Sequence, residues 1–274
     1  MKASGTSSCN VLVILFALLL TSAPLFGHNS ALDRIMQTQP FSGVVYAARG
    51  DDVLISYASG FARAESQTPN EESTLFPIAS ITKVITAFAI ESLVSENLIA
   101  PDERVATYLS SYPWNKDLTI DDLLTHRSAL VRDVTDLGLL SPYENVSLDV
   151  LVSMISKASG NHRAGRNYSY GNANYQVLAK IIEAVTGSSY ESYIRKNVFE
   201  VAGMPHSKIL MKEHPEDVAL GYLDGSSSSI QLPSFHYSHM IGSGNLASNV
   251  VELASFAKRV LYQLEDNQRL RLPW

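Results

Sequence analysis

The sequence has a single cysteine among its 274 residues. Cys9 precedes an apolar run, whereas a lipid-anchoring cysteine should follow one, so we do not expect lipidation. One thiol cannot form a disulfide framework, and removal of a signal peptide would take Cys9 with it. A cysteine nucleophile and a cysteine metal site are excluded for the same reason.

Long hydrophobic runs and basic clusters are also missing. The apolar run at residues 11–20 is too short to cross a bilayer, but it suits the hydrophobic region of a signal peptide after Lys2. We therefore expect residues 1–27 to be a signal peptide with an undefined cleavage site, and a periplasmic or secreted protein without a stable membrane span. An uncleaved anchor is the less favoured alternative. The net charge is −6 and no Lys/Arg run occurs, so no nucleic-acid partner is expected.

The remaining residues, 28–274, are enough to bury a hydrophobic core in one large domain or two intimate ones, since 46% of the chain is hydrophobic. Residues 41–48 and 53–58, with Gly50 between them, predict a β-hairpin. A two-stranded hairpin is not stable alone, so further strands are needed from elsewhere in the chain. Helical apolar spacing follows at residues 80–95, 119–125, 148–157, 175–185, 190–201 and 250–264.

The residue pair most suited to chemistry is Ser80 and Lys83, at the start of the first predicted helix. Residues three apart share a helix face, and a desolvated lysine can take the proton of a serine hydroxyl. Ser255 and Lys258 have the same spacing, but that pair falls inside the last predicted helix. There Lys258 is most simply a solvated charge. The alternative without a catalytic role is that Ser80 is a helix N-cap and Lys83 a surface lysine.

A second candidate element is Tyr170-Gly171-Asn172. A phenol near Ser80 could pass a proton to a leaving group, and the Asn172 amide could hold a substrate carbonyl. Tyr143 and Asn145 have the same spacing, so the pattern is weak by itself.

Taken together, these segments resemble the serine β-lactamase and penicillin-recognising DD-peptidase superfamily, in the branch with class C-like β-lactamases. The segments with this resemblance are residues 74–83, 123–130, 170–172, 198–204 and 242–253. The resemblance implies an α/β fold, an antiparallel sheet flanked by helices with an inserted helical domain. It also implies that Ser80 forms an acyl-enzyme on an amide or ester carbonyl of a small molecule or peptidoglycan peptide. Lys83 and Tyr170 would then transfer protons during the reaction, and Asn172 would position the substrate. No metal or other cofactor would be needed.

The sequence departs from this family pattern at Arg127, Ala129 and Asn245, and no Lys/His-Thr/Ser-Gly triplet occurs before Trp274. In the family that triplet lies on a sheet strand and completes the oxyanion hole. We therefore expect a C-terminally incomplete domain that is poorly stable and weakly active or inactive.

Two alternatives to a β-lactam or D-alanyl peptide hydrolase stay open: an esterase on the same scaffold, and a catalytically silent binding protein or truncated product. His126 is expected to be structural, and His236 with His239 to line a loop or pocket rim in preference to a metal site. The missing Gly-x-Ser-x-Gly motif disfavours an α/β-hydrolase.

Overall fold

The computed structural model describes residues 41–138, 140–159, 167–211, 215–222 and 236–267, with side chains up to residue 261. The predicted signal peptide at residues 1–27 lies outside these ranges. The described residues fall into two compact units, one of residues 41–72 with 219–222 and the other of the described residues from 73 to 218 and from 236 onward.

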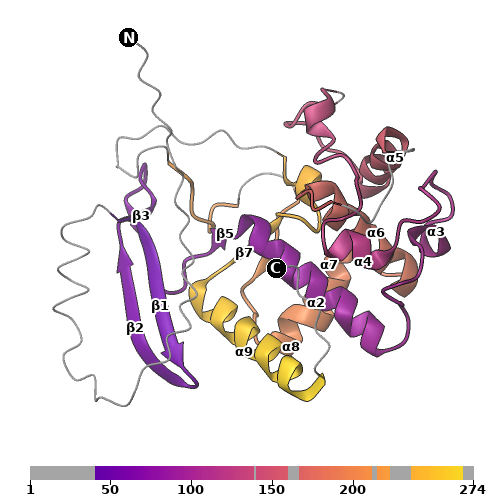
Figure 1. The fold of residues 1–274 in the computed structure, drawn as a ribbon. Helices are drawn as coiled ribbons and strands as arrows, with labels where there is room; N and C mark the ends of the chain where they lie inside the picture. Colours follow the sequence, from indigo (N-terminus) through magenta and orange to yellow (C-terminus); the bar gives the residue numbers. More distant parts are fainter. Residues whose placement is uncertain (1–40, 139, 160–166, 212–214, 223–235, 268–274) are drawn as a thin grey trace, which may run out of the picture. The chain divides into compact units, whose positions relative to one another are not determined.

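The first unit contains the predicted hairpin. Strand β1 (Gly43–Arg49) pairs antiparallel with β2 (Asp52–Ser59), and the register shifts between Ala47 and Ala48 (Figure 1). Gly50 takes the left-handed φ of 57° that the tight turn requires. The short strands β3 (Phe61–Arg63) and β4 (Thr68–Pro69) form a second antiparallel pair. The hairpin prediction is therefore confirmed.

The second unit is mainly helical around a small antiparallel sheet. The sheet has the order β5 (Phe76–Pro77), β7 (Leu246–Ser248), β6 (Lys208–Ile209). Its helices and turns are η1 (Ala79–Ile81), α2 (Thr82–Ser95), α3 (Val105–Tyr108), α4 (Ile120–Leu124), η2 (Thr135–Leu137), α5 (Leu148–Ala158), α6 (Asn172–Thr186), α7 (Tyr190–Ile194), η3 (Arg195–Phe199), α8 (Glu200–Ala202), η4 (Tyr237–Met240) and α9 (Val250–Asn267). The predicted α/β class is confirmed, with small antiparallel sheets.

Each helix predicted from apolar spacing is present, and the differences have local causes. Helix α6 begins at Asn172, three residues before its first apolar marker, because extended Gly171 ends the preceding loop there. The predicted helix at residues 190–201 is interrupted by the π-helical turn Arg195–Phe199. Helix α3 was not predicted, because its four residues are too few to show a periodic pattern.

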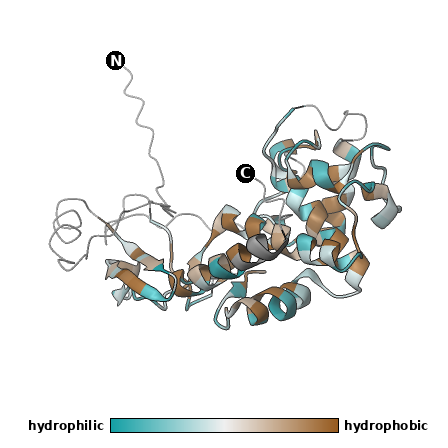
Figure 2. Ribbon diagram, turned by 60° about the horizontal axis from the view of Figure 1, so that its bottom comes forward, coloured by the Kyte–Doolittle hydropathy of each residue, from teal (hydrophilic) through white to brown (hydrophobic). Residues whose placement is uncertain are grey.

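Helix α2 lies in the core of this unit, with buried residues on all its faces. It packs against α6, and the ring of Phe88 meets that of Phe256 in α9 edge to face at 5.4 Å (Figure 1). Hydrophobic residues recur along the helices in Figure 2, interleaved with hydrophilic ones. Because α2 is enclosed, polar groups in its first turns need partners within the protein.

Residues 242–246 supply several of those partners. Thr86 Oγ1 donates to the carbonyl of Gly242 at 2.8 Å, and the backbone N–H of Leu246 donates to Thr82 Oγ1 at 3.3 Å. Gly242 has a φ of 75°, and a Cβ there would meet the Tyr175 carbonyl oxygen at 2.5 Å, so only glycine fits. This segment therefore packs tightly against both α2 and α6.

Candidate active site

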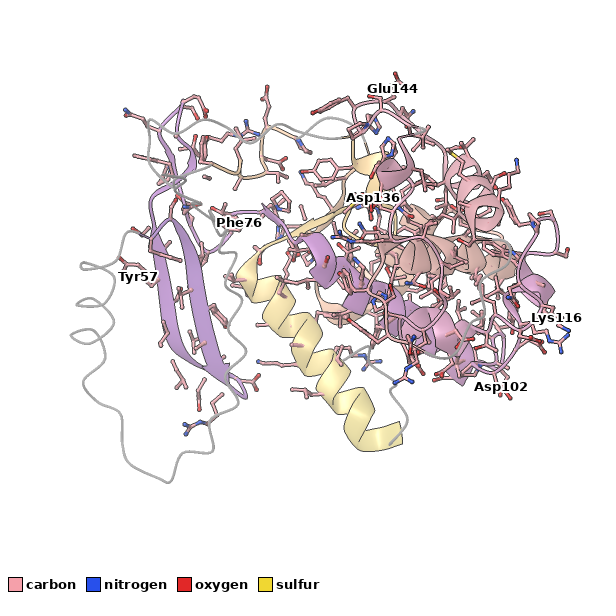
Figure 3. All side chains as sticks on the ribbon, turned by 45° about the horizontal axis from the view of Figure 1, so that its top comes forward. Tyr57, Phe76, Asp102, Lys116, Asp136 and Glu144 are labelled. Atoms are coloured by element: carbon pink, nitrogen blue, oxygen red, sulfur yellow. The ribbon has the colours of Figure 1, made fainter. Side chains whose placement is uncertain are left out.

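The local fold presents Ser80 at the surface. Strand β5, where Figure 3 labels Phe76, leads into η1, which contains Ser80 and runs directly into α2. Ala79 has a left-handed φ of 45°, an unfavourable conformation for a residue with a Cβ. Ser80 is exposed, and within the described chain its backbone N–H donates no hydrogen bond. An oxyanion could accept a hydrogen bond from this free donor.

Lys83 lies beneath Ser80 and is only 3% exposed. Its Nζ donates to Ser80 Oγ at 3.2 Å, to Asn172 Oδ1 at 2.8 Å and to the Ser243 carbonyl at 2.8 Å. Burial lowers the pKa of Lys83 from 10.5 to about 8, although the charge of Asp133 acts in the opposite direction. The structure therefore contains a buried amine in contact with an exposed hydroxyl, and the lowered pKa of that amine makes its neutral form more accessible than in an ordinary lysine.

Tyr170 contacts the same lysine through its ring. Lys83 Nζ lies 4.9 Å from the ring centroid, and the side chain of Tyr170 borders solvent, with the residue 40% exposed. In the described part of the chain its hydroxyl makes no hydrogen bond, so the phenol is free to meet a bound molecule. The proton-transfer role of Tyr170 stays a prediction.

Asn172 bridges two charged residues from the first turn of α6. Its Oδ1 accepts from Lys83, while its Nδ2 donates to Asp133 Oδ2 at 2.9 Å and contacts Met240 Sδ at 3.8 Å. Both ends of the amide are therefore engaged, and the predicted contact with a substrate carbonyl would have to replace one of these. Asp133 and the Ser243 carbonyl were not among the predicted site groups, since neither belongs to a short motif.

His126 holds the loop that carries Tyr170, in agreement with its predicted structural role. It is 3% exposed, its Nδ1 meets Asn174 Nδ2 at 3.0 Å, and its carbonyl accepts from Ser169 N at 2.8 Å. Burial and the nearby Lys83 charge lower the pKa of His126 to about 4, so the ring is neutral at pH 7. The rings of His126 and Tyr170 lie 4.6 Å apart.

The competing motif copies have other surroundings. Ser255 is inside α9, where its Oγ donates to the Ala202 carbonyl at 2.6 Å. Tyr143 is a loop residue, 64% exposed. Neither Ser255 nor Tyr143 makes a hydrogen bond to Ser80 or Lys83.

The two loop histidines bond to protein oxygen atoms. His236 Nδ1 meets Ser238 Oγ at 2.7 Å, and His239 Nε2 meets the Glu144 carbonyl at 2.7 Å. Within the described ranges, no three His, Cys, Asp or Glu residues gather as metal ligands would. No helix in those ranges is both long and apolar enough to span a membrane.

The fold and this Ser-Lys-Tyr-Asn arrangement resemble those of β-lactamases and penicillin-binding proteins. The chain belongs to the beta-lactamase family, whose model matches residues 28–273. The teichoic acid D-alanine hydrolase of Staphylococcus aureus (strain MRSA252) is 26% identical over 230 residues, which cover 84% of this chain and 56% of that protein.

Two solved structures are also similar. FmtA from Staphylococcus aureus has a TM-score of 0.75 and 25% identity, covering 84% of this chain and 65% of that one. A penicillin binding protein from Bacillus halodurans has a TM-score of 0.71 and 26% identity, and the match covers 85% of this chain and 73% of that one. The chain spans about half to two thirds of the length of the curated relatives it matches, between 47% and 62%.

Two departures from the family pattern can now be placed. Ala129 has a φ of 58°, the left-handed region in which the glycine of the pattern would be unstrained. Asn245 is fully buried, and its Oδ1 accepts from Gly242 N at 3.1 Å while its Nδ2 donates to the Leu210 carbonyl at 3.4 Å. The asparagine is therefore accommodated with both ends of its amide satisfied, whereas the alanine is held under backbone strain.

Proposed function

We propose that this protein is a serine hydrolase that works through an acyl-enzyme on Ser80. The observation that carries the proposal is the 3.2 Å contact between Lys83 Nζ and the exposed Ser80 hydroxyl, together with the lowered Lys83 pKa of about 8. Membership of the beta-lactamase family supports the same reaction class.

In this proposal, neutral Lys83 takes the proton of Ser80 Oγ as that oxygen attacks an amide or ester carbonyl. The carbonyl oxygen becomes an oxyanion facing the free N–H of Ser80. The intermediate collapses when the bond to the leaving group breaks, and that group receives a proton through Tyr170. Water then attacks the acyl-enzyme, restores the Ser80 hydroxyl and releases the acid.

The substrate class we propose is a β-lactam or a D-alanyl ester or peptide, including peptidoglycan peptides. A relative named for teichoic acid D-alanine hydrolysis and a neighbour named for penicillin binding support this choice. Such substrates lie outside the cytoplasm, so we also propose an exported, periplasmic or secreted protein. An esterase on the same scaffold is the alternative, because the fold does not determine the leaving group.

The test is covalent labelling of the full chain with a fluorophosphonate and a fluorescent penicillin, followed by peptide mapping. We expect label on Ser80, none in Ser80→Ala, and full label in the matched variant Ser255→Ala. Label on Ser255, or label that survives Ser80→Ala, would disprove the assignment. A folded chain that takes up neither probe would be a silent binding protein.

A further inference from the structure

Asn174 is a buried amide in the first turn of α6 to which the proposed reaction assigns no role. It is 1% exposed, and its Oδ1 is hydrogen-bonded to the hydroxyl of Ser128. Its Nδ2 lies 3.3 Å from the carbonyl oxygen of Gly171 and 3.0 Å from Nδ1 of His126. The amide therefore joins the loop that contains Tyr170 to the loop that begins at His126.

The partners of this amide determine which way it points. A backbone carbonyl can only accept, so the Asn174 atom that faces the Gly171 carbonyl must be the NH₂ nitrogen. At the other end, Ser128 Oγ accepts from the N–H of Leu130 at 3.1 Å, and its own proton is left for the amide oxygen. Both ends of the Asn174 side chain thus require the same orientation.

This orientation determines the tautomer of His126. The NH₂ group of Asn174 has one proton for the Gly171 carbonyl and a second for His126 Nδ1. The backbone N–H of Gly171 also donates to that nitrogen, at 3.4 Å. A ring nitrogen that meets two donors must be an acceptor, so the ring is neutral and its proton is on Nε2.

In this tautomer, His126 holds the backbone on both sides of Tyr170. The His126 carbonyl accepts from the N–H of Ser169 at 2.8 Å, and Nδ1 accepts from the N–H of Gly171. The imidazole ring also lies 4.6 Å from the ring of Tyr170, whose hydroxyl bonds to no described residue. The position of the phenol therefore depends on its backbone and ring face, and the other tautomer would turn an N–H toward the N–H of Gly171.

We propose that Asn174 is a positioning residue for Tyr170, because it selects the His126 tautomer that holds the Tyr170 backbone in place for proton transfer. This inference rests on the proposed function of Ser80 and Tyr170. It adds to that function a residue whose hydrogen bonds, in the described part of the chain, go to neither Ser80 nor Lys83.

The first measurement reads the tautomer directly. Nitrogen chemical shifts of the full chain with ¹⁵N-labelled histidine, at pH 7, distinguish a protonated ring nitrogen from a bare one. The His126 signals are assigned by their loss in His126→Asn, since asparagine tolerates the left-handed φ of 55° at this position. We expect Nδ1 to be bare in the parent chain and protonated in Asn174→Asp, whose carboxylate can only accept from it.

The second measurement is turnover of an amide, either a chromogenic cephalosporin or D-alanine p-nitroanilide. Proton transfer by a positioned group is worth roughly 10²- to 10⁴-fold in rate, and we expect Asn174→Asp to lose roughly 10- to 100-fold of this. In a Tyr170→Phe background the same substitution should cost less than about 3-fold, because residues that act through one another are not additive. Ser80 should still react with a fluorophosphonate, since fluoride leaves without a proton from Tyr170.

Asn197→Asp is the matched control. The Asn197 amide also donates to a backbone carbonyl, that of Tyr193 at 3.1 Å, but it lies in η3 and has no contact with His126 among the described hydrogen bonds. It should leave both the His126 signals and amide turnover unchanged.

A protonated Nδ1 in the parent chain would refute the inference even if Asn174→Asp failed to fold. A loss of turnover that is as large in the Tyr170→Phe background would refute action through Tyr170 and leave the proposed function standing. A parent chain that does not label at Ser80 would refute the proposed function and the positioning role together. A parent that labels but turns over no amide would refute the positioning role alone.

Discussion

Replacing Lys83 by methionine removes the proposed base but keeps an unbranched side chain of similar length. With the pKa lowered from 10.5 to about 8, about 10% of Lys83 is neutral at pH 7, compared with about 0.03% for an unperturbed lysine. Burial therefore raises the population of the reactive form about 300-fold. We expect the labelling rate of Ser80 in the parent chain to rise with pH and level off above the pKa of about 8.

The assay is the rate of fluorophosphonate labelling between pH 6 and 10, corrected for decay of the probe, with circular dichroism to check folding at each pH. Lys83→Met should label roughly 10²- to 10⁴-fold more slowly and show no such inflection, because proton transfer is lost. Lys258→Met, in the second Ser-x-x-Lys copy, should behave as the parent does. Parental labelling by Lys83→Met, or a parent rate that is independent of pH, would refute the reasoning.

The same pKa has a consequence for stability. The folded pKa lies below the unfolded value, so the unfolded chain holds the proton more tightly and protonation favours unfolding. From 10.5 to about 8 the cost at pH 7 is about 3 kcal/mol, present in full below pH 8 and lost as the pH rises to 10.5. Relative to Lys83→Met, which has no such titration, the parent should gain stability between pH 8 and 10.5 in urea unfolding. A constant difference would refute the lowered pKa.

Three further results are expected. Tyr170→Phe should slow turnover of an amide roughly 10²-fold or more while leaving the melting temperature within error, because the hydroxyl makes no hydrogen bond with the described residues; parental turnover would exclude its role in proton transfer. Ala129→Gly should raise the free energy of unfolding by about 0.5–1 kcal/mol, because it relieves the strain of an alanine in the left-handed region. The control Ala254→Gly, within α9, should lower the free energy of unfolding by about 1 kcal/mol. A less stable Ala129→Gly would contradict the strain argument. Asp133→Asn should move the labelling inflection of Lys83 to lower pH, since the Asp133 charge raises that pKa; an inflection that moves upward would contradict the sign.

Much of this protein follows from local sequence patterns. The hairpin needs only its alternating strands and Gly50, and the six apolar-periodic helices form where their spacing predicts them. Ser80 and Lys83 meet because residues three apart share a helix face, a relation that any helix start imposes. Sequence order and motif type also singled out Tyr170 and Asn172 as neighbours of that pair.

Only the tertiary structure decided how these residues act on one another. The contacts of Lys83 with Asn172 and with the Ser243 carbonyl join residues 89 and 160 positions apart, and no local periodicity specifies such pairs. The lysine pKa falls because α2 is enclosed by α6 and residues 242–246, so its cause is burial and not the identity of neighbouring residues. Asp133 belongs to no motif at all. It enters the site because the Asn172 amide has a donor left over once its oxygen has bound Lys83, and the fold brings a carboxylate to that donor.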